Sequence, residues 1–199
     1  MSCKLRKTMT VDQFDGNYYY ATKLKDFARK IGITVGNFRK IEIEVLIRQF
    51  LTTGQVPQAK PVQPRESNSK RDTLTATTTV ENYVGNKATK SFLLALVEAQ
   101  SPGIRNKSGQ WYWLNDWRRK QQAKKLQFTY NDLANELHRL MTCPERLPQI
   151  PSARMNNFIA DYLADPANKN HSRKDAQKAW EKIKTIKGPK THEAYLAQQ

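Results

Sequence analysis

The chain is 199 residues long, which suits one or two domains, and its 34 lysines and arginines outnumber 18 aspartates and glutamates to give a net charge of +16. So large an excess attracts polyanions, and it favours nucleic acid or an anionic surface as the partner. Residues 1–54, 55–80 and 81–199 are each net positive, which excludes a single basic tail on an otherwise neutral domain.

The two cysteines, Cys3 and Cys143, are too few for a disulfide framework, and we expect both to be reduced thiols. No run approaches the roughly 18 apolar residues of a membrane span, and the first residues lack the apolar region of a secretory signal. The sequence therefore predicts a cytoplasmic, intracellular protein without a membrane segment, associated with the nucleoid if its source is bacterial.

Apolar residues recur with the period of a helix along most of the chain, which predicts an all-α fold. The pattern indicates a small helix–loop–helix module followed by a separate C-terminal domain of about five helices. The expected order is a flexible N-terminus at 1–13, the module at 14–54, a linker at 55–80, the helical domain at 81–190 and a tail at 191–199.

The module is expected to contain two short amphipathic helices. Apolar residues share one face of each helix: Leu24, Phe27, Ala28 and Ile31 in the first, and Ile43, Leu46, Ile47 and Phe50 in the second, where Ile41 and Val45 widen the face. Thr22 is the expected N-cap of the first helix. Gly32 and Gly54 are the expected ends of the two helices, because glycine adopts the left-handed conformation at little cost.

Aromatic residues precede the first helix, at Phe14 and at Tyr18–Tyr20. We expect them to pack across the two helices, because so small a pair buries too little apolar surface alone. Stacking on nucleic-acid bases is the alternative.

The loop between the two helices is the first candidate binding site. Gly36 and Asn37 form a turn signal, and Arg39 and Lys40 stand at the start of the second helix. A helix N-terminus offers unpaired N–H groups and the positive end of the helix dipole, so it suits a phosphate. The alternative is that Arg39 and Lys40 only solubilise the module. Lys23, Lys25 and Arg48 are further candidates for contact with nucleic acid.

The module resembles the SAP motif, a helix–loop–helix found in many chromatin and DNA-associated proteins. The matching residues are Leu24, Phe27, Gly32, Ile33, Gly36, Lys40, Glu42, Ile43, Ile47 and Leu51. The sequence departs from the family pattern where Phe38 intervenes between Gly36 and the basic residues, and where Leu46 replaces a frequent arginine, with Arg48 two residues on. The resemblance implies binding of double-stranded DNA through the loop and the start of the second helix, without strong base specificity.

Residues 55–80 read as a linker because Pro57, Pro61 and Pro64 favour an extended conformation. The threonine-rich stretch from Thr73 to Val80 is suited either to a short strand or to an extended approach to the next domain. Beyond it, the apolar pattern predicts helices at 87–100, 109–125, 129–142, 152–164 and 172–186. The pairs Thr129 with Asp132 and Ser172 with Asp175 have capping-box spacing.

The helical domain offers a second candidate surface. Residues 111–125 combine tryptophans with cations, an arrangement that suits stacking on bases and contact with phosphates. We favour packing of the tryptophans in the core, with Trp113 and Trp117 pointing inward together. The last predicted helix carries a lysine stripe, which suits a polyanion or serves solubility. The candidate residues of this surface are Arg118, Arg119, Lys124, Lys174 and Lys178, with Lys182 continuing the stripe.

The C-terminal stretch is similar to an uncharacterised helical region that follows the SAP motif in some bacterial proteins. The matching residues are Phe158, Tyr162, Asp175, Ala176 and Trp180. Residues 101–150 look like an insertion in that pattern or a divergence from it. The resemblance implies no defined activity.

Motifs of catalysis or cofactor binding are missing from the sequence: it has no HExxH, GxSxG, Walker or GxGxxG pattern, and its three histidines are scattered. We therefore expect neither an enzyme nor a cofactor or metal site. The expected function is binding of nucleic acid, duplex DNA in the first place, through backbone phosphates. The alternatives are association with RNA or the ribosome, and an adaptor whose C-terminal helical domain docks a protein partner; the sequence leaves the oligomeric state open.

Overall fold

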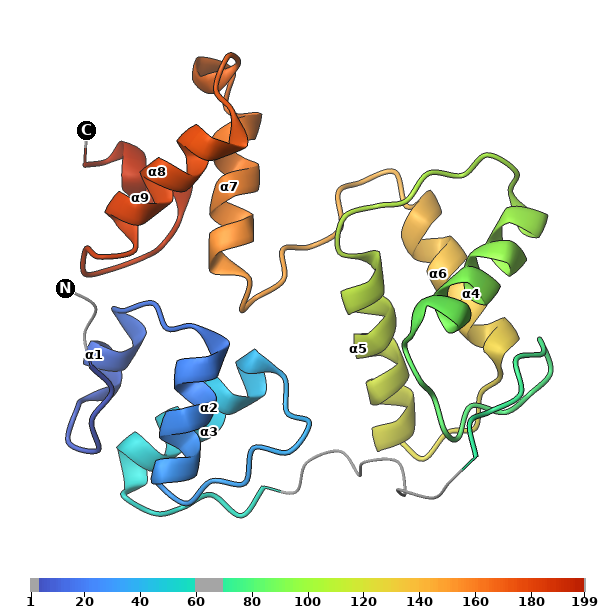
Figure 1. Cartoon of the computed structure of the whole chain (residues 1–199), viewed down its shortest axis with the longest axis horizontal. Coiled ribbons are helices and arrows are strands. Elements are labelled where there is room, and N and C mark those ends of the chain that lie inside the picture. Colours follow the sequence, from blue (N-terminus) through green and yellow to red (C-terminus); the bar gives the residue numbers. More distant parts are fainter. Residues whose placement is uncertain (1–3, 60–69, 199) are drawn as a thin grey trace. The chain divides into compact units, whose positions relative to one another are not determined.

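A computed structural model of the chain describes residues 4–59 and 70–198 (Figure 1). Within these residues the regular elements are helical, which confirms the expected all-α fold. The helices are α1 (Val11–Asp15), α2 (Ala21–Lys30), α3 (Lys40–Thr53), α4 (Lys87–Gln100), α5 (Gln110–Ala123), α6 (Tyr130–Thr142), α7 (Arg154–Ala164), the 3-10 helix η1 (Pro166–Asn168), α8 (Arg173–Ile183) and α9 (His192–Leu196). In the described part of the chain, none of them is long and apolar enough to cross a membrane.

The chain divides into two compact units that do not follow the expected order of domains. The first unit joins Met1–Pro64 to Pro151–Gln199, and the second consists of Arg65–Ile150. The predicted helical domain at 81–190 is therefore split, because α7, α8 and α9 belong with the N-terminal helices. Both units are basic, with 20 basic against 10 acidic residues in the first and 14 against 8 in the second.

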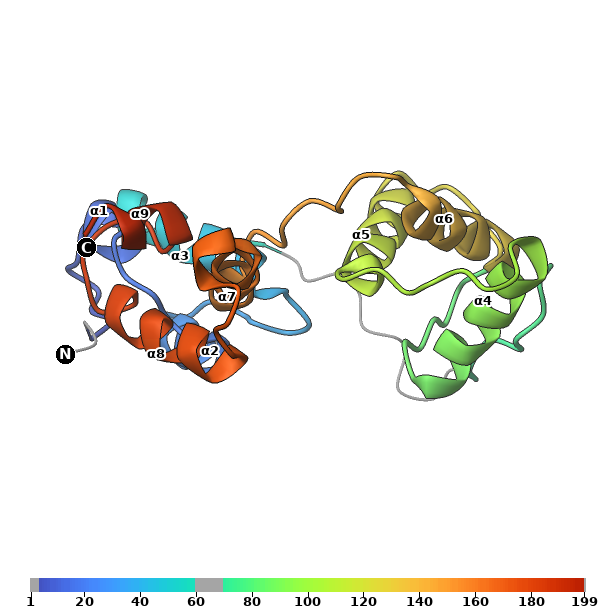
Figure 2. The ribbon, with the colours of Figure 1, turned by 90° about the horizontal axis from the view of Figure 1, so that it is seen from above.

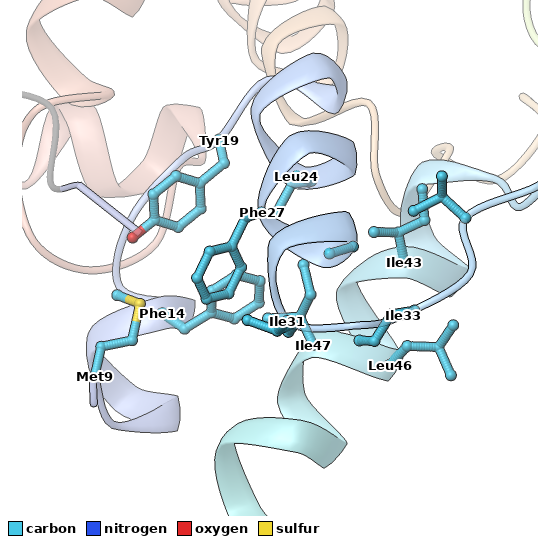
Figure 3. Packing of buried hydrophobic residues seen from close by; sticks show 12 residues of the cluster. Met9, Phe14, Tyr19, Leu24, Phe27, Ile31, Ile33, Ile43, Leu46 and Ile47 are labelled. Carbon is cyan, nitrogen blue, oxygen red and sulfur yellow. The ribbon is translucent and has the colours of Figure 1, made fainter. Parts of the chain in front are cut away.

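The N-terminal helices of the first unit enclose one apolar cluster. Phe14 and Phe27 face Ile31 and Ile47 between α1, α2 and α3 (Figure 3). Met9 is buried in the same cluster, so the chain is already packed before residue 14, where we expected a flexible N-terminus. Residues 1–3 of that expected segment lie outside the described residues.

The predicted end of α2 is confirmed, whereas its predicted start is wrong. Gly32 has a φ of 88°, and the N–H of Ile33 donates to the carbonyl of Ala28 at 2.9 Å. This φ and this hydrogen bond are typical of a helix that ends at a glycine. Thr22 is not the N-cap, because α2 begins two residues earlier than a cap at Thr22 implies, at Ala21, and Tyr20 is the N-cap. At the end of α3, Gly54 has a φ of 69° and confirms the second predicted stop.

The buried face of α3 differs from the predicted one at two positions. Ile43, Leu46 and Ile47 are buried as expected, but the side of the helix at Val45 faces solvent, with Val45 53% exposed. In its place the buried face includes Glu44.

The C-terminal helices of the first unit enclose a second apolar cluster around Phe158 and Trp180. Tyr18, from the segment between α1 and α2, packs against it with its ring at right angles to that of Trp180, 4.9 Å between centroids. Residues 191–199 are not a simple tail, because α9 begins there and Tyr195 packs edge-on against Phe158. Phe14 and Tyr19 therefore pack against the module helices as the favoured interpretation expected, whereas Tyr18 packs on the C-terminal cluster and Tyr20 is 47% exposed.

In the second unit, α6 lies between α4 and α5 and packs against both (Figure 2). The threonine-rich stretch lies beside the start of α6 with a turn at Ala76 and Thr77, and one antiparallel bridge joins Thr79 to Thr129. Asp72 accepts hydrogen bonds from the N–H of Asn82 at 2.8 Å and from the hydroxyl of Tyr130 at 3.1 Å. Residues 70–80 are thus a part of this unit rather than of a linker, and residues 60–69 lie outside the described residues.

Candidate nucleic-acid interface

The loop that joins α2 to α3 exposes its tip and buries its flanks. Gly36 and Asn37 are exposed in a turn closed by a hydrogen bond from the N–H of Phe38 to the carbonyl of Val35 at 3.0 Å. Val35 is buried, and Phe38 packs against the same apolar cluster as α2 and α3. The predicted turn is therefore present, and it leaves only its two central residues in solvent.

Arg39 already has an anionic partner at the start of α3. Its backbone N–H donates to the carboxylate of Glu42 at 2.7 Å, and its Nε donates to the same carboxylate at 3.1 Å. Both side chains are about a quarter exposed. Because a carboxylate from the helix itself occupies this N-terminus, the site is less suited to a phosphate than the sequence suggests.

Lys40 points into the first unit rather than into solvent. Its Nζ donates to the carbonyl of Ser152 at 3.3 Å, lies 3.7 Å from a carboxylate oxygen of Glu44, and sits 4.4 Å from the ring centroid of Tyr18. Its side chain is only 14% exposed, and this burial lowers the pKa of Lys40 below its usual value. Lys40 therefore connects α3 to the segment that precedes α7, which corrects its predicted role as a contact to phosphate.

Glu44 and Arg154 complete this junction network, which we define as Tyr18, Lys40, Glu44, Ser152 and Arg154. The side chain of Glu44 is 4% exposed, and Arg154 places a guanidinium nitrogen 4.0 Å from its second carboxylate oxygen. Arg154 also donates to the carbonyl of Asn17 at 3.2 Å. Sequence reasoning missed this network, although an acidic residue four positions after Lys40 on an apolar helix face was a signal for it.

The secondary candidates of the module have different surroundings. Lys23 is exposed on α2, and Lys25 is half-buried on the same helix. Arg48 is held inside the unit, because its Nε donates to Asp15 at 2.7 Å and its guanidinium lies over the ring of Phe14. Of the predicted loop site, only Gly36, Asn37 and Lys23 face solvent freely enough to meet a large ligand.

The second candidate surface separates into two places, because its residues belong to different units. The Cζ of Arg118 lies 4.7 Å from the ring centroid of Tyr83, and its guanidinium donates hydrogen bonds to the side chains of Asn115 and Gln122. Burial lowers the pKa of this guanidinium. Arg119 is half-buried beside it, whereas Lys124 is exposed just after α5. Arg118 therefore has a structural role in the second unit, and Lys124 remains accessible.

The tryptophans of α5 pack as the favoured interpretation expected. Trp111, Trp113 and Trp117 are partly buried against the apolar cluster of the second unit. The indole N–H of Trp113 donates to the carbonyl of Pro148 at 2.9 Å, and the ring of Trp117 meets that of Phe128 edge-on. Their main contacts are thus internal.

The lysine stripe on α8, formed by Lys174, Lys178 and Lys182, is exposed. The opposite face of the helix is buried through Ala176, Ala179, Trp180 and Ile183. Lys178 lies 3.4 Å from Asp175, and within the described residues no carboxylate is in ion-pair range of Lys174 or Lys182. The packing of α8 therefore fixes the direction in which these three cations point.

Among residues 4–59 and 70–198, no group of three or more histidine, cysteine, aspartate or glutamate side chains is placed to hold a metal ion. Comparison with models of protein families finds no match, and neither does comparison with curated proteins or with solved structures. The resemblance of the module to the SAP motif accordingly stays a prediction from its residues.

Proposed function

We propose that this protein binds nucleic acid, duplex DNA in the first place, through backbone phosphates and with little sequence preference. The observation that carries the proposal is the lysine stripe on α8, in which three cations are held on one exposed face by a buried opposite face. The excess of basic residues in both units supports it, because a long polyanion is attracted by the field of the whole chain. The exposed turn at Gly36 and Asn37, together with Lys23, is the contribution that we assign to the module.

The spacing of the stripe suits a phosphate backbone. A helix rises 1.5 Å per residue, so Lys174 and Lys182 are separated by about 12 Å along α8. One strand of B-DNA carries a phosphate about every 3.4 Å of helix axis, so the stripe spans several phosphates and can neutralise up to three. Repulsion between the three lysines opposes their placement on one face, and a polyanion would relieve it.

A salt titration tests the proposal. The dissociation constant for a fluorescent 20-base-pair duplex is measured between low and physiological salt for the wild type and for Lys174→Gln/Lys178→Gln/Lys182→Gln. Each phosphate contact contributes about 0.9 to the slope of log K against log salt, so we expect the triple variant to lose up to about 2.7 of that slope. A matched control replaces Lys7, Lys87 and Lys169 with glutamine. These three lysines are exposed outside α8, and their replacement removes the same number of positive charges.

The outcomes separate the site from the function. If the triple variant keeps the wild-type slope, α8 is not part of the interface. If the wild type binds neither duplex DNA nor RNA in a salt-dependent way, the proposed function is wrong. Competition between duplex DNA, single strands and structured RNA at fixed salt then shows which nucleic acid the protein prefers.

A further inference from the structure

A hollow in the first unit lies between the N-terminal segment and the chain that follows α8. Figure 1 shows the segment after α8 passing close to α1 before it enters α9. The hollow has a volume of about 550 Å³, which lies in the range of small-molecule sites. Its lining includes Lys4, Arg6, Thr8, Asn17, Thr185 and Lys187. We call this cavity the basic hollow.

The walls of the basic hollow are fixed by contacts that do not involve its cations. On one side, Met9 is buried in the apolar cluster of α1–α3 and holds the N-terminal segment in place. On the other side, the N–H of Gly188 donates to the carbonyl of Gly16 at 3.3 Å. The buried ammonium of Lys190 donates to the same carbonyl at 3.1 Å and also to that of Ile186. The fold thus brings together two segments that are far apart in the sequence.

The chemistry of the lining suits an oxyanion. Lys4, Arg6 and Lys187 provide three positive charges, and Asp12 is the only carboxylate among the described lining residues. Thr8 also lines the hollow, and its hydroxyl can donate a hydrogen bond to an oxygen atom, whereas the hydroxyl of Thr185 already donates to the carbonyl of Lys182 at 2.8 Å. Like charges gathered around a concave surface repel one another, and a bound anion turns that cost into attraction. Arginine adds a planar pair of donors that matches the oxygens of a phosphate.

We propose that the basic hollow binds a phosphate group, and that this phosphate belongs to the nucleic acid that the proposed function assigns to the protein. Two sources share the chemistry: the monoester at the end of a strand and a diester within it. The hollow is larger than one phosphate, so it has room for the nucleotide that carries a terminal phosphate. A terminal phosphate also carries up to two charges, which three cations hold more strongly than one charge.

Two measurements on the full chain test this inference. In the first, inorganic phosphate is titrated into ¹⁵N-labelled protein, and we expect shifts at the amides of residues 5–9 and 185–188. In the second, binding is compared between duplexes with 5′-phosphate and 5′-hydroxyl ends. We expect the phosphorylated duplex to bind about tenfold more tightly through its charge-assisted hydrogen bonds. Arg6→Gln/Lys187→Gln should abolish both effects, whereas the control Lys7→Gln/Lys169→Gln, with the same change in charge, should keep both.

The results distinguish the sources and the two proposals. Phosphate-induced shifts with equal affinity for both duplex ends support the hollow as a site for an internal phosphate. Such shifts in a protein that binds no nucleic acid support a phosphate site while refuting the proposed function. If phosphate shifts none of these amides and the hollow variant binds both duplexes like its control, the inference is overturned, even where the α8 variant has lost affinity for DNA.

Discussion

Replacing Lys40 with methionine separates the structural role of this lysine from the DNA contact that the sequence predicts. In the structure its ammonium lies 3.7 Å from the buried carboxylate of Glu44 and donates to the carbonyl of Ser152 at 3.3 Å. Methionine preserves much of the side-chain length but removes the charge, so among the described residues Glu44 would retain only Arg154, at 4.0 Å. The structure therefore predicts a loss of stability in the first unit and an unchanged salt dependence of DNA binding.

The size of the loss follows from the burial of Glu44, whose side chain is 4% exposed. Removing one partner of a buried ion pair typically costs about 3–5 kcal/mol. We expect about 3 kcal/mol, at the lower end, because Arg154 still offers partial compensation. Since 1.4 kcal/mol corresponds to a factor of ten, exchange of protected amides that require opening of this unit should accelerate by about two orders of magnitude. In Lys40→Met/Glu44→Gln the uncompensated charge is gone, so most of the loss should be recovered.

Hydrogen exchange measured by mass spectrometry resolves the effect by unit. Peptides from α3 and α8 report on the first unit, and peptides from α6 serve as an internal control because they belong to the second. Lys169→Met, at an exposed position of the first unit, is the matched control for the loss of one lysine. The reasoning would be refuted if Lys40→Met left exchange in α3 and α8 unchanged while it lowered the salt slope of DNA binding.

Two further predictions concern α8. The hydroxyl and backbone N–H of Ser172 donate to the carboxylate of Asp175 at 2.7 and 3.0 Å and lower its pKa to about 2. The pKa of Asp175 is lower in the folded chain than in the unfolded chain. The contribution of Asp175 to folding stability is therefore complete above pH 3.8 and is lost as the pH falls from 3.8 towards 2. Ser172→Ala should therefore return the pKa of Asp175 towards 3.8 in a carboxyl ¹³C titration, and an unshifted titration would contradict the capping role. Trp180→Ala should destabilise the first unit by about 3–5 kcal/mol in denaturant unfolding, because its side chain is 1% exposed; peptides from α6 should keep wild-type exchange.

The local structure of the chain could be predicted well from its sequence. Gly32 and Gly54 end their helices with positive φ, and the capping boxes at Thr129 and Ser172 begin theirs. These signals act within one turn of chain, so their spacing specifies them fully. The predicted burial of Val45 was wrong for a different reason. The period of a helix fixes which residues share a face, but it does not fix how wide the buried part of that face is.

The pairing of distant segments could not be predicted in this way. Lys40 and Ser152 are 112 residues apart, and neither carries a local signal that the other is its partner. An exposed lysine at the start of a helix and a lysine turned towards a distant carbonyl have the same sequence pattern. For that reason the predicted loop site was read as a surface, and the contribution of Arg154 was missed. The lysine stripe on α8 was predictable, because its exposure follows from the apolar residues on the opposite face of the same helix.

The discontinuous composition of the first unit has a consequence for the order of events during synthesis on the ribosome. Residues 65–150 emerge before residue 151 and contain all the helices of the second unit, so that unit can acquire its fold first. The segment that contains α1–α3 is translated before the second unit, but two of its residues contact residues that are translated after it. Glu44 contacts Arg154, and Tyr18 packs on Trp180. Contacts this distant close slowly, because a long loop loses entropy before they form. Chains that end at residue 150, once released from the ribosome, should consequently protect α6 from proteolysis while leaving α3 open to cleavage.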